Sequence, residues 1–152
     1  MREQKSYYAK PEDIKKKWVL IDVKDQILGR VASEIASLIR GKTKVDFTPS
    51  MDVGEFVVVI NADKVVVSGK KAEDKKYYHH TGYPKGLRCL SYKQLKEKDP
   101  TQVLSKAIWG MLPKNKIGRK MFKNLKIYSG EEHPHKAQNP EIITLPLKKG
   151  GK

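Results

Sequence analysis

Residues 18–60 read WVLIDVKDQILGRVASEIASLIRGKTKVDFTPSMDVGEFVVVI. Two short apolar runs, residues 18–21 and 56–60, are continuous, as is typical of strands buried on both faces of a sheet. Between them, apolar residues recur with the spacing of one helix face, at positions 27, 31, 35, 38 and 39. The order strand, helix, strand predicts an α/β fold with a mainly parallel sheet and a right-handed crossover.

Terminal signals flank the predicted helix. Asp25 is a candidate N-cap, because its side chain can accept a hydrogen bond from the first helical turn. Gly41 suits the left-handed position just past the last turn. A third, short strand is predicted at residues 65–67. The preceding residues 61–64 could form a hairpin turn or a bend within a continuing strand, and the sequence does not decide between the two.

The second half of the chain alternates polar loops with shorter elements. Residues 69–88, GKKAEDKKYYHHTGYPKGLR, are predicted to form a basic, aromatic loop. A short helix is predicted at residues 91–98. Asp99 and Pro100 then supply an N-cap and a first-turn proline for a further helix, which Pro113 ends. A strand is predicted at residues 126–128.

A cationic segment without any acid lies between that helix and that strand. Its Lys and Arg residues are Lys114, Lys116, Arg119, Lys120, Lys123 and Lys126. At about 100° per residue, a helix over residues 116–126 places Ile117, Met121 and Leu125 on one arc and the cations on the other. Exposed helices usually mix Glu with Lys. An unneutralised cationic face therefore predicts binding to a phosphate backbone.

The charge of the whole chain supports the same prediction. The formal net charge of the 152 residues is +15. Residues 101–152 hold 11 Lys and Arg against 3 Asp and Glu, so +8 of this excess lies in the last third. We expect that third to lead contact with a polyanion.

The length of the chain fits one domain. We predict an N-terminal arm at residues 1–16, a single α/β domain at residues 17–141 and a C-terminal tail at residues 142–152. The longest apolar run is too short to span a bilayer, and the N-terminus has no apolar run of the kind found in secretory signals. We therefore expect a cytoplasmic protein with no membrane partner.

Patterns for catalysis, cofactors and metals are incomplete. No G-x-G-x-x-G occurs, so a Rossmann-like layout here would lack its dinucleotide fingerprint. Gly41-Lys42-Thr43 fails as a phosphate loop, because these residues end a helix and do not begin one. The histidines lack the usual zinc-ligand spacing with cysteines. Asp52 with Glu55 could serve a nuclease only in a geometry that the sequence does not specify. No catalytic residue, metal, cofactor or small-molecule substrate is predicted.

Cations and ring side chains outside the cationic segment complete the predicted RNA-binding set. Tyr and His in irregular segments can stack on unpaired bases or contact phosphates, although hydrogen bonding within loops explains the histidines equally well. The predicted RNA-binding residues are Lys70, Lys71, Lys75, Lys76, Tyr77, His79, His80, Arg88, Lys114, Lys116, Arg119, Lys120, Lys123, Lys126, His133, His135 and Lys136.

Five segments of the chain occur in the order found in a known family. They are WVLIDVKDQILGRVASEIASLIRGK, TPSMDVGEFVVVINADKVVVSGKK, KKYYHHTGYPKGL, GMLPKN and NLKIYSGEEHPHKAQ. Together they resemble the bacterial large-subunit ribosomal protein thirteen family over roughly residues 10–145. The closing LKKGGK is not part of the family pattern.

This resemblance implies a three-layer α/β/α domain with a four-stranded parallel sheet. It also implies binding to large-subunit ribosomal RNA near its 5′ part, an early role in subunit assembly, and contacts with neighbouring large-subunit proteins. The family has no catalytic residue, so none is carried over. Two rival hypotheses remain. An RNA-processing enzyme would show metal- or cofactor-dependent turnover, and a DNA-compacting basic protein would bind duplex DNA with equal affinity.

Overall fold

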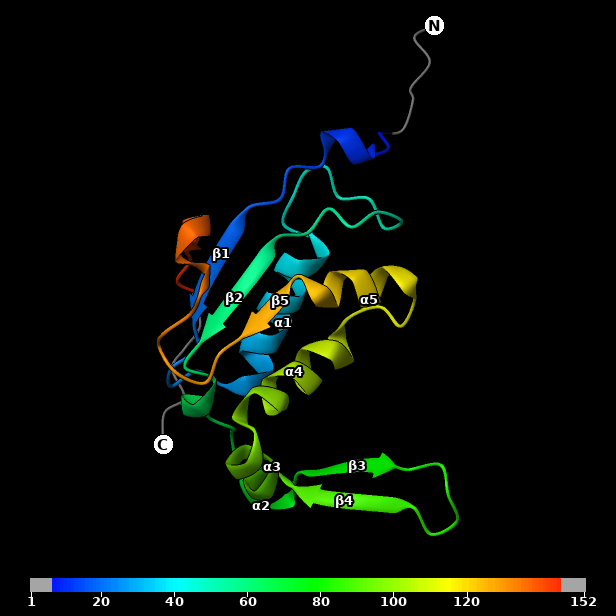
Figure 1. The fold of residues 1–152 in the computed structure, drawn as a ribbon, viewed down its shortest axis with the longest axis vertical. Coiled ribbons are helices and arrows are strands. Elements are labelled where there is room, and N and C mark those ends of the chain that lie inside the picture. The colour runs from blue at the N-terminus through cyan, green and yellow to red at the C-terminus, as the bar shows by residue number, and fades with distance from the viewer. Residues whose placement is uncertain (1–6, 146–152) are drawn as a thin grey trace, which may run out of the picture.

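A computed structural model of the chain describes residues 7–145, with a parallel sheet at its centre (Figure 1). The strands follow the order β5-β2-β1-β6 and are parallel wherever they pair. They are β1 (Trp18–Asp22), β2 (Phe56–Ile60), β5 (Leu125–Ile127) and β6 (Glu141–Ile142). Numbered along the chain within this sheet, the order is 3-2-1-4, which is Rossmann-like. The predicted parallel four-stranded α/β fold is confirmed.

Side chains alternate between the two faces of the sheet. On one face, Val19 and Val57 point into the main hydrophobic core. On the opposite face, Trp18 stacks on Phe56 with ring centroids 4.7 Å apart. The first face is covered by α1 (Leu28–Arg40), α4 (Pro100–Met111) and α5 (Lys116–Lys123), and the second by the 3₁₀ helix η3 (His135–Gln138) (Figure 1). This arrangement agrees with the predicted three-layer architecture.

Helix α1 begins later than predicted. It starts at Leu28, and Asp25 lies before it with a left-handed φ of 57° and makes no cap. Gln26 and Ile27 are held as extended chain instead, because the backbone N–H of Val66 donates to the Gln26 carbonyl at 3.0 Å. The Asp25 cap was therefore a wrong prediction. Gly41 ends the helix as predicted, with a φ of 78° and its N–H bonded to Leu38.

Residues 65–67 form no strand, so this prediction was wrong. After β2, Asn61 takes a left-handed φ of 59° and starts the 3₁₀ helix η2 (Ala62–Lys64). Neither reading of residues 61–64 is therefore correct. Val66 makes one isolated parallel bridge to Ile27. The three valines at 65–67 indicated a strand. After the left-handed turn at Asn61, however, they lie beside the start of α1 and make no further sheet pairing than this bridge.

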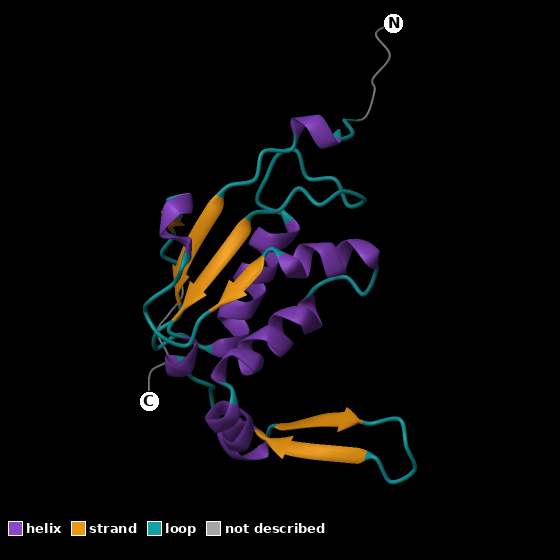
Figure 2. Ribbon diagram, viewed as in Figure 1, coloured by secondary structure: helices purple, strands orange, loops and turns teal. Residues whose placement is uncertain are grey.

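Residues 69–88, predicted as a loop, contain regular structure. A short helix, α2 (Lys71–Asp74), leads into the antiparallel hairpin β3 (Lys76–His80) and β4 (Leu87–Ser91). The hairpin extends away from the main sheet (Figure 2). Most of its side chains are exposed on both faces. The hairpin therefore lacks the alternation of apolar and polar residues by which a half-buried strand is recognised.

Both helices after the hairpin are capped at their starts, and the Asp99 cap of the second was predicted. Helix α3 (Tyr92–Lys98) begins with a capping box, in which the side chains of Ser91 and Gln94 bond to each other's backbone N–H groups. Helix α4 begins after Asp99, whose carboxylate accepts from the Thr101 N–H at 3.0 Å and from the Thr101 hydroxyl at 2.6 Å. The hydrogen bonds from Thr101 lower the pKa of Asp99 below its ordinary value of 3.8.

The Asp99 cap predicts a pH-dependent loss of stability. A carboxylate whose folded pKa is lowered stabilises the protein fully above its unfolded pKa, and this contribution is lost as the pH falls through the folded pKa. Asp99→Ala should lower the free energy of unfolding by about 1 kcal/mol at pH 7. In urea unfolding, the difference in the free energy of unfolding between the unaltered chain and Asp99→Ala should become smaller as the pH falls below the ordinary pKa of 3.8. A gap of constant size down to pH 2.5, or an equal loss in the exposed control Glu97→Ala, would contradict the assignment.

The limits of the domain stay a prediction. Within the proposed arm, the Ala9 backbone N–H donates to the Thr48 hydroxyl at 3.2 Å. Ile142, at the proposed start of the tail, pairs with Leu20 in the sheet. Residues 1–6 and 146–152 of the arm and tail lie outside the described residues.

Candidate nucleic-acid interface

Helix α5 has one buried arc and one cationic arc, as predicted. Asn115 caps its start by accepting the Gly118 N–H at 2.8 Å. Met121 is buried against the core at 1% exposure, and Ile117 packs beside it. The four cations of the helix, Lys116, Arg119, Lys120 and Lys123, are all exposed. The buried arc therefore holds the helix on the domain while the cationic arc faces outward.

The cationic helix is shorter than predicted. It ends at Lys123, and residues 125–127 form β5, so the predicted helical positions of Leu125 and Lys126 are wrong. Pairing with β2 explains the difference, because Leu125 continues the core beside Val57. Lys126 is in register with Val58, a residue on the sheet face opposite the main core. Lys126 therefore lies on the other side of the sheet from the buried arc of α5.

The cations of α5 have no acidic partner among residues 7–145. The salt bridges described there join Lys16 to Asp52, Lys44 to Glu55 and Lys64 to Glu131, at 2.5, 2.7 and 3.3 Å. All three lie outside α5. The charge of the cationic arc is therefore open to an external anion, as phosphate binding requires.

Two of those salt bridges use the carboxylates considered for a nuclease. Asp52 accepts from Lys16 and also from the amide of Asn124, at 3.2 Å to each oxygen. Glu55 is buried and pairs with Lys44 while accepting the Lys17 backbone N–H. Both carboxylates thus join chain segments within the fold. Among the described residues, no group of three or more His, Cys, Asp or Glu side chains is placed to hold a metal ion.

Lys114 lies in the connection between α4 and α5. Its ammonium group is 4.4 Å from the centroid of the Trp109 ring and also donates to the Trp109 carbonyl. Trp109 in turn packs edge-to-face on Phe122 of α5, with centroids 5.1 Å apart. A cation near the C-terminal carbonyls of α4 is favourable. Lys114 is therefore fixed beside the cationic arc of α5.

A second cationic group lies at the base of the hairpin. The Tyr77 ring carries the ammonium of Lys75 at 5.4 Å and that of Lys106 at 5.3 Å from its centroid. Tyr77 is half-buried against the core, and burial raises its pKa. The ring is therefore engaged within the protein and offers little free surface to a base. Sequence reasoning missed Lys106, because it is the single cation of α4 and belongs to no basic run.

The remaining predicted residues of the hairpin region are exposed. His79 lies opposite Arg88 in the antiparallel register, so the two strands place them together. His80 accepts the Gly82 N–H through Nδ1 at 3.0 Å. Lys70 and Lys71 lie at the start of α2, and Lys76 begins β3. These residues therefore lie at α2 and along the hairpin, which extends away from the main sheet (Figure 2).

His133 and His135 lie on the sheet face opposite α1 and α4. His135 stacks over Trp18 with centroids 5.1 Å apart, and its Nε2 is 2.9 Å from the Tyr128 hydroxyl. His133 is stacked on His135 at 6.5 Å between centroids. Both rings are half-buried, whereas the neighbouring Lys136 is exposed. The packing supports the hydrogen-bonding reading for His135.

His135→Ala should therefore destabilise the fold. Loss of the ring contact and of the Tyr128 hydrogen bond should lower the free energy of unfolding by about 1–2 kcal/mol. His79→Ala is the matched control, because His79 is exposed on the hairpin, and its unfolding midpoint in urea should not move. Equal midpoints for the two variants would show that His135 has no structural role.

A comparison with known proteins identifies the family. Residues 16–134 match the family model described as ribosomal protein L13. The chain belongs to the ribosomal protein L13 family. A relative from Caldanaerobacter subterraneus subsp. tengcongensis, "Large ribosomal subunit protein uL13", is 56% identical over 141 residues, covering 93% of this chain and 99% of the relative. Its namesake from Alcanivorax borkumensis is 54% identical over the same shares of the two chains.

The L13 family is one of ribosomal proteins and not of enzymes. A third relative with the same name, from Chlorobium limicola, is 54% identical and covers 90% of this chain and 91% of its own length. Among the described residues, no helix has the length and apolar character needed to cross a bilayer. In this L13-family chain the predicted site residues lie at α5 with the connection before it, at α2 with the hairpin, and at η3, while Lys126 lies apart from α5 on β5.

Proposed function

We propose that the chain is a structural component of the large ribosomal subunit that binds large-subunit ribosomal RNA in the cytoplasm. The observation that carries this proposal is the cationic arc of α5, defined by Lys116, Arg119, Lys120 and Lys123, which has no described acidic partner. Membership of the L13 family supports it, since the relatives are named as large-subunit proteins.

The fold suggests how binding would work. One side of α5 is buried against the domain through Met121 and Gly118, so the cations on the other side project from a rigid surface. The second group, around Lys75 and Lys106, is held by the Tyr77 ring. Lysine and arginine that neutralise phosphates release condensed counterions, which favours binding and makes it sensitive to salt. Two separated cationic groups would offset the repulsion between RNA segments and hold them together.

We also propose an early role in assembly, which the family resemblance implies. Neutralised phosphates would support such a role, because RNA segments must lose their mutual repulsion before they can pack. We propose that the contacted RNA lies near the 5′ part of the large-subunit ribosomal RNA, and that the chain also contacts neighbouring large-subunit proteins. The side chains of Tyr78 and Leu87 on the hairpin support such contacts. They are 65% and 62% exposed in the isolated chain, and exposed apolar side chains often lie in contact with other molecules. Depletion of the protein should then accumulate large-subunit precursors and leave the small subunit unaffected.

Filter binding with purified full-length chain tests the RNA preference directly. At 150 mM salt, we expect large-subunit ribosomal RNA to bind at least about tenfold more tightly than duplex DNA of matched length, because irregular RNA offers shape as well as charge. Equal affinities would instead favour the DNA-compacting hypothesis. Release of processed RNA fragments during the incubation would favour an enzyme.

A further inference from the structure

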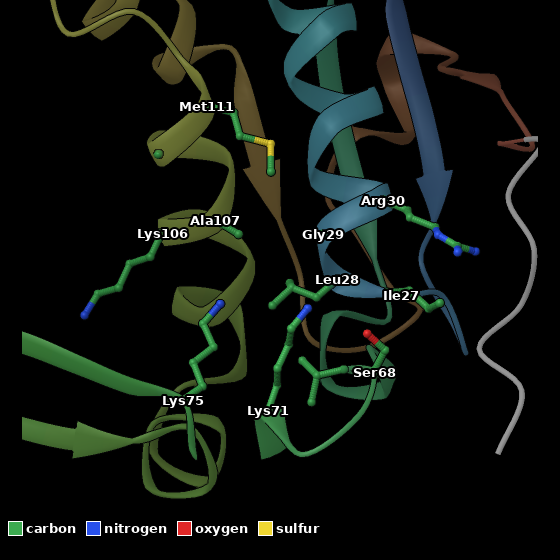
Figure 3. A pocket seen from close by; sticks show the side chains of 12 residues that line it. Ile27, Leu28, Gly29, Arg30, Ser68, Lys71, Lys75, Lys106, Ala107 and Met111 are labelled. Carbon is green, nitrogen blue, oxygen red and sulfur yellow. The ribbon is translucent and has the colours of Figure 1, made fainter. Parts of the chain in front are cut away.

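A cleft of about 640 Å³ lies between α1 and α4, next to α2. Its apolar lining includes Ile27, Leu28, Ala107 and Met111, and its glycines are Gly29 and Gly110 (Figure 3). Ligand pockets commonly have such volumes, with mainly apolar walls and a few polar groups. Of its lining, the binding mechanism proposed above uses only Lys75 and Lys106, and it makes no use of the apolar walls.

The polar groups at the cleft are almost all cations. Lys71 and Lys75 rise from the α2 end into the space between the two helices, while Arg30 and Lys106 extend outward at its sides (Figure 3). No acidic side chain lines the cleft, and the acids of α2, Glu73 and Asp74, are exposed and outside the lining. No described salt bridge involves these four cations.

We propose that this cleft binds one unpaired nucleotide of RNA. The base lies against Ala107 and Met111, above the buried Leu28, and the phosphate lies between the ammonium groups of Lys71 and Lys75. This inference rests on the proposed function and names a specific contact within it. RNA that is recognised through its loops presents unstacked bases, which proteins bind on apolar and aromatic surfaces while cations hold the adjoining phosphates.

The composition of the cleft favours a nucleotide over other occupants. A bare phosphate would leave the apolar walls uncovered, and an apolar peptide would bury the lysine ammonium groups without partners. A nucleotide has an apolar, stackable face joined to an anionic phosphate, and so matches both parts of the lining. Pairing would hide the edges and faces of the base, so a nucleotide within a duplex does not fit.

Nuclear magnetic resonance titration of the full-length ¹⁵N-labelled chain tests the proposal with AMP, UMP and inorganic phosphate as probes. Either nucleotide should shift the backbone amides of Leu28, Gly29 and Met111 in a saturable way, with half-saturation in the millimolar range. Inorganic phosphate alone should shift the backbone amide signals of Lys71 and Lys75 but not those of the apolar lining. Equal shifts of the apolar lining with phosphate, or no saturable shifts with any probe, would overturn the proposal.

Filling the cleft provides a second test that leaves every charge in place. An added Cβ at Gly110 or Gly29 would meet no heavy atom within 4 Å. Gly110→Leu should therefore fold, and it should weaken nucleotide binding at least about tenfold, the size of a lost base-stacking contact. Gly110→Ala is the matched control and should retain binding. Lys71→Gln with Lys75→Gln should also weaken binding, whereas Lys93→Gln on α3 should not.

The outcomes separate this inference from the proposed function. If Gly110→Leu still binds nucleotide as tightly as the unaltered chain, the cleft is not the site, whatever the ribosomal role. If nucleotide binding is lost in Gly110→Leu but the unaltered chain does not associate with large subunits in cells, the cleft assignment holds and the ribosomal proposal fails.

Discussion

Arg119→Glu combined with Lys123→Glu should weaken binding to large-subunit ribosomal RNA by about a hundredfold at 100 mM salt. Both side chains lie on the exposed cationic arc of α5 and have no described acidic partner. Reversal removes two attractive contacts with phosphate and adds two repulsive ones. The slope of log affinity against log salt should fall by about 2, since each contact contributes close to one unit.

The same double variant should keep the melting temperature of the unaltered chain, because surface substitutions away from packed features change stability little. Lys24→Glu with Lys93→Glu is the matched control, which makes the same change in net charge at two other exposed positions. An equal loss of affinity in the control would show that net charge, and not the cationic arc, governs binding. Unchanged affinity in the α5 variant would show that α5 does not contact RNA.

Gly118→Ala should cost about 3 kcal/mol or more of folding stability. A Cβ at this position would lie 1.8 Å from the Pro113 carbonyl oxygen and 2.8 Å from its carbon. Both are backbone atoms, so no side-chain rotation relieves the clash. Helix α5 must therefore move away from the end of α4, which would uncover Met121 and displace the cationic arc. We expect a lower melting temperature together with weaker RNA binding.

Gly110→Ala provides the matched comparison, because Gly110 is also helical but has no heavy atom within 4 Å of an added Cβ. Alanine has a higher helix propensity than glycine, so this variant should keep its stability or gain up to about 1 kcal/mol. Similar melting temperatures for the two alanine variants would contradict the close approach of α5 to Pro113.

Features with a strong local signal were predictable from the sequence. The continuous run Phe56–Ile60 and the caps at Asp99 and Gly41 have local causes, and the structure has each of them as predicted. The arcs of α5 were also predictable, since helical periodicity separates Met121 from the cations. Three-layer architecture and the fourth strand came from the family resemblance, because the two residues of β6 carry no pattern of their own.

Features set by distant contacts were not predictable. Asp25 has the chemistry of an N-cap, but hydrogen bonds between residues 26–28 and Val66 fix where α1 begins. The hairpin has no buried apolar face, so the clear alternation of apolar and polar residues that reveals a strand is missing. Lys106 joins the hairpin cations only because α4 brings it to Tyr77. For the start of α1 and for Lys106, the partner lies far away in the chain, and periodicity reports only local order.

Sucrose-gradient sedimentation of a cell lysate, probed for this chain at low and then at high salt, tests the ribosomal assignment most directly. We predict that the chain sediments with the large subunit at both salt concentrations, because cations held on a folded surface and matched to RNA shape resist competition by salt better than an exposed polycation does. Recovery at the top of the gradient at low salt would contradict the assignment.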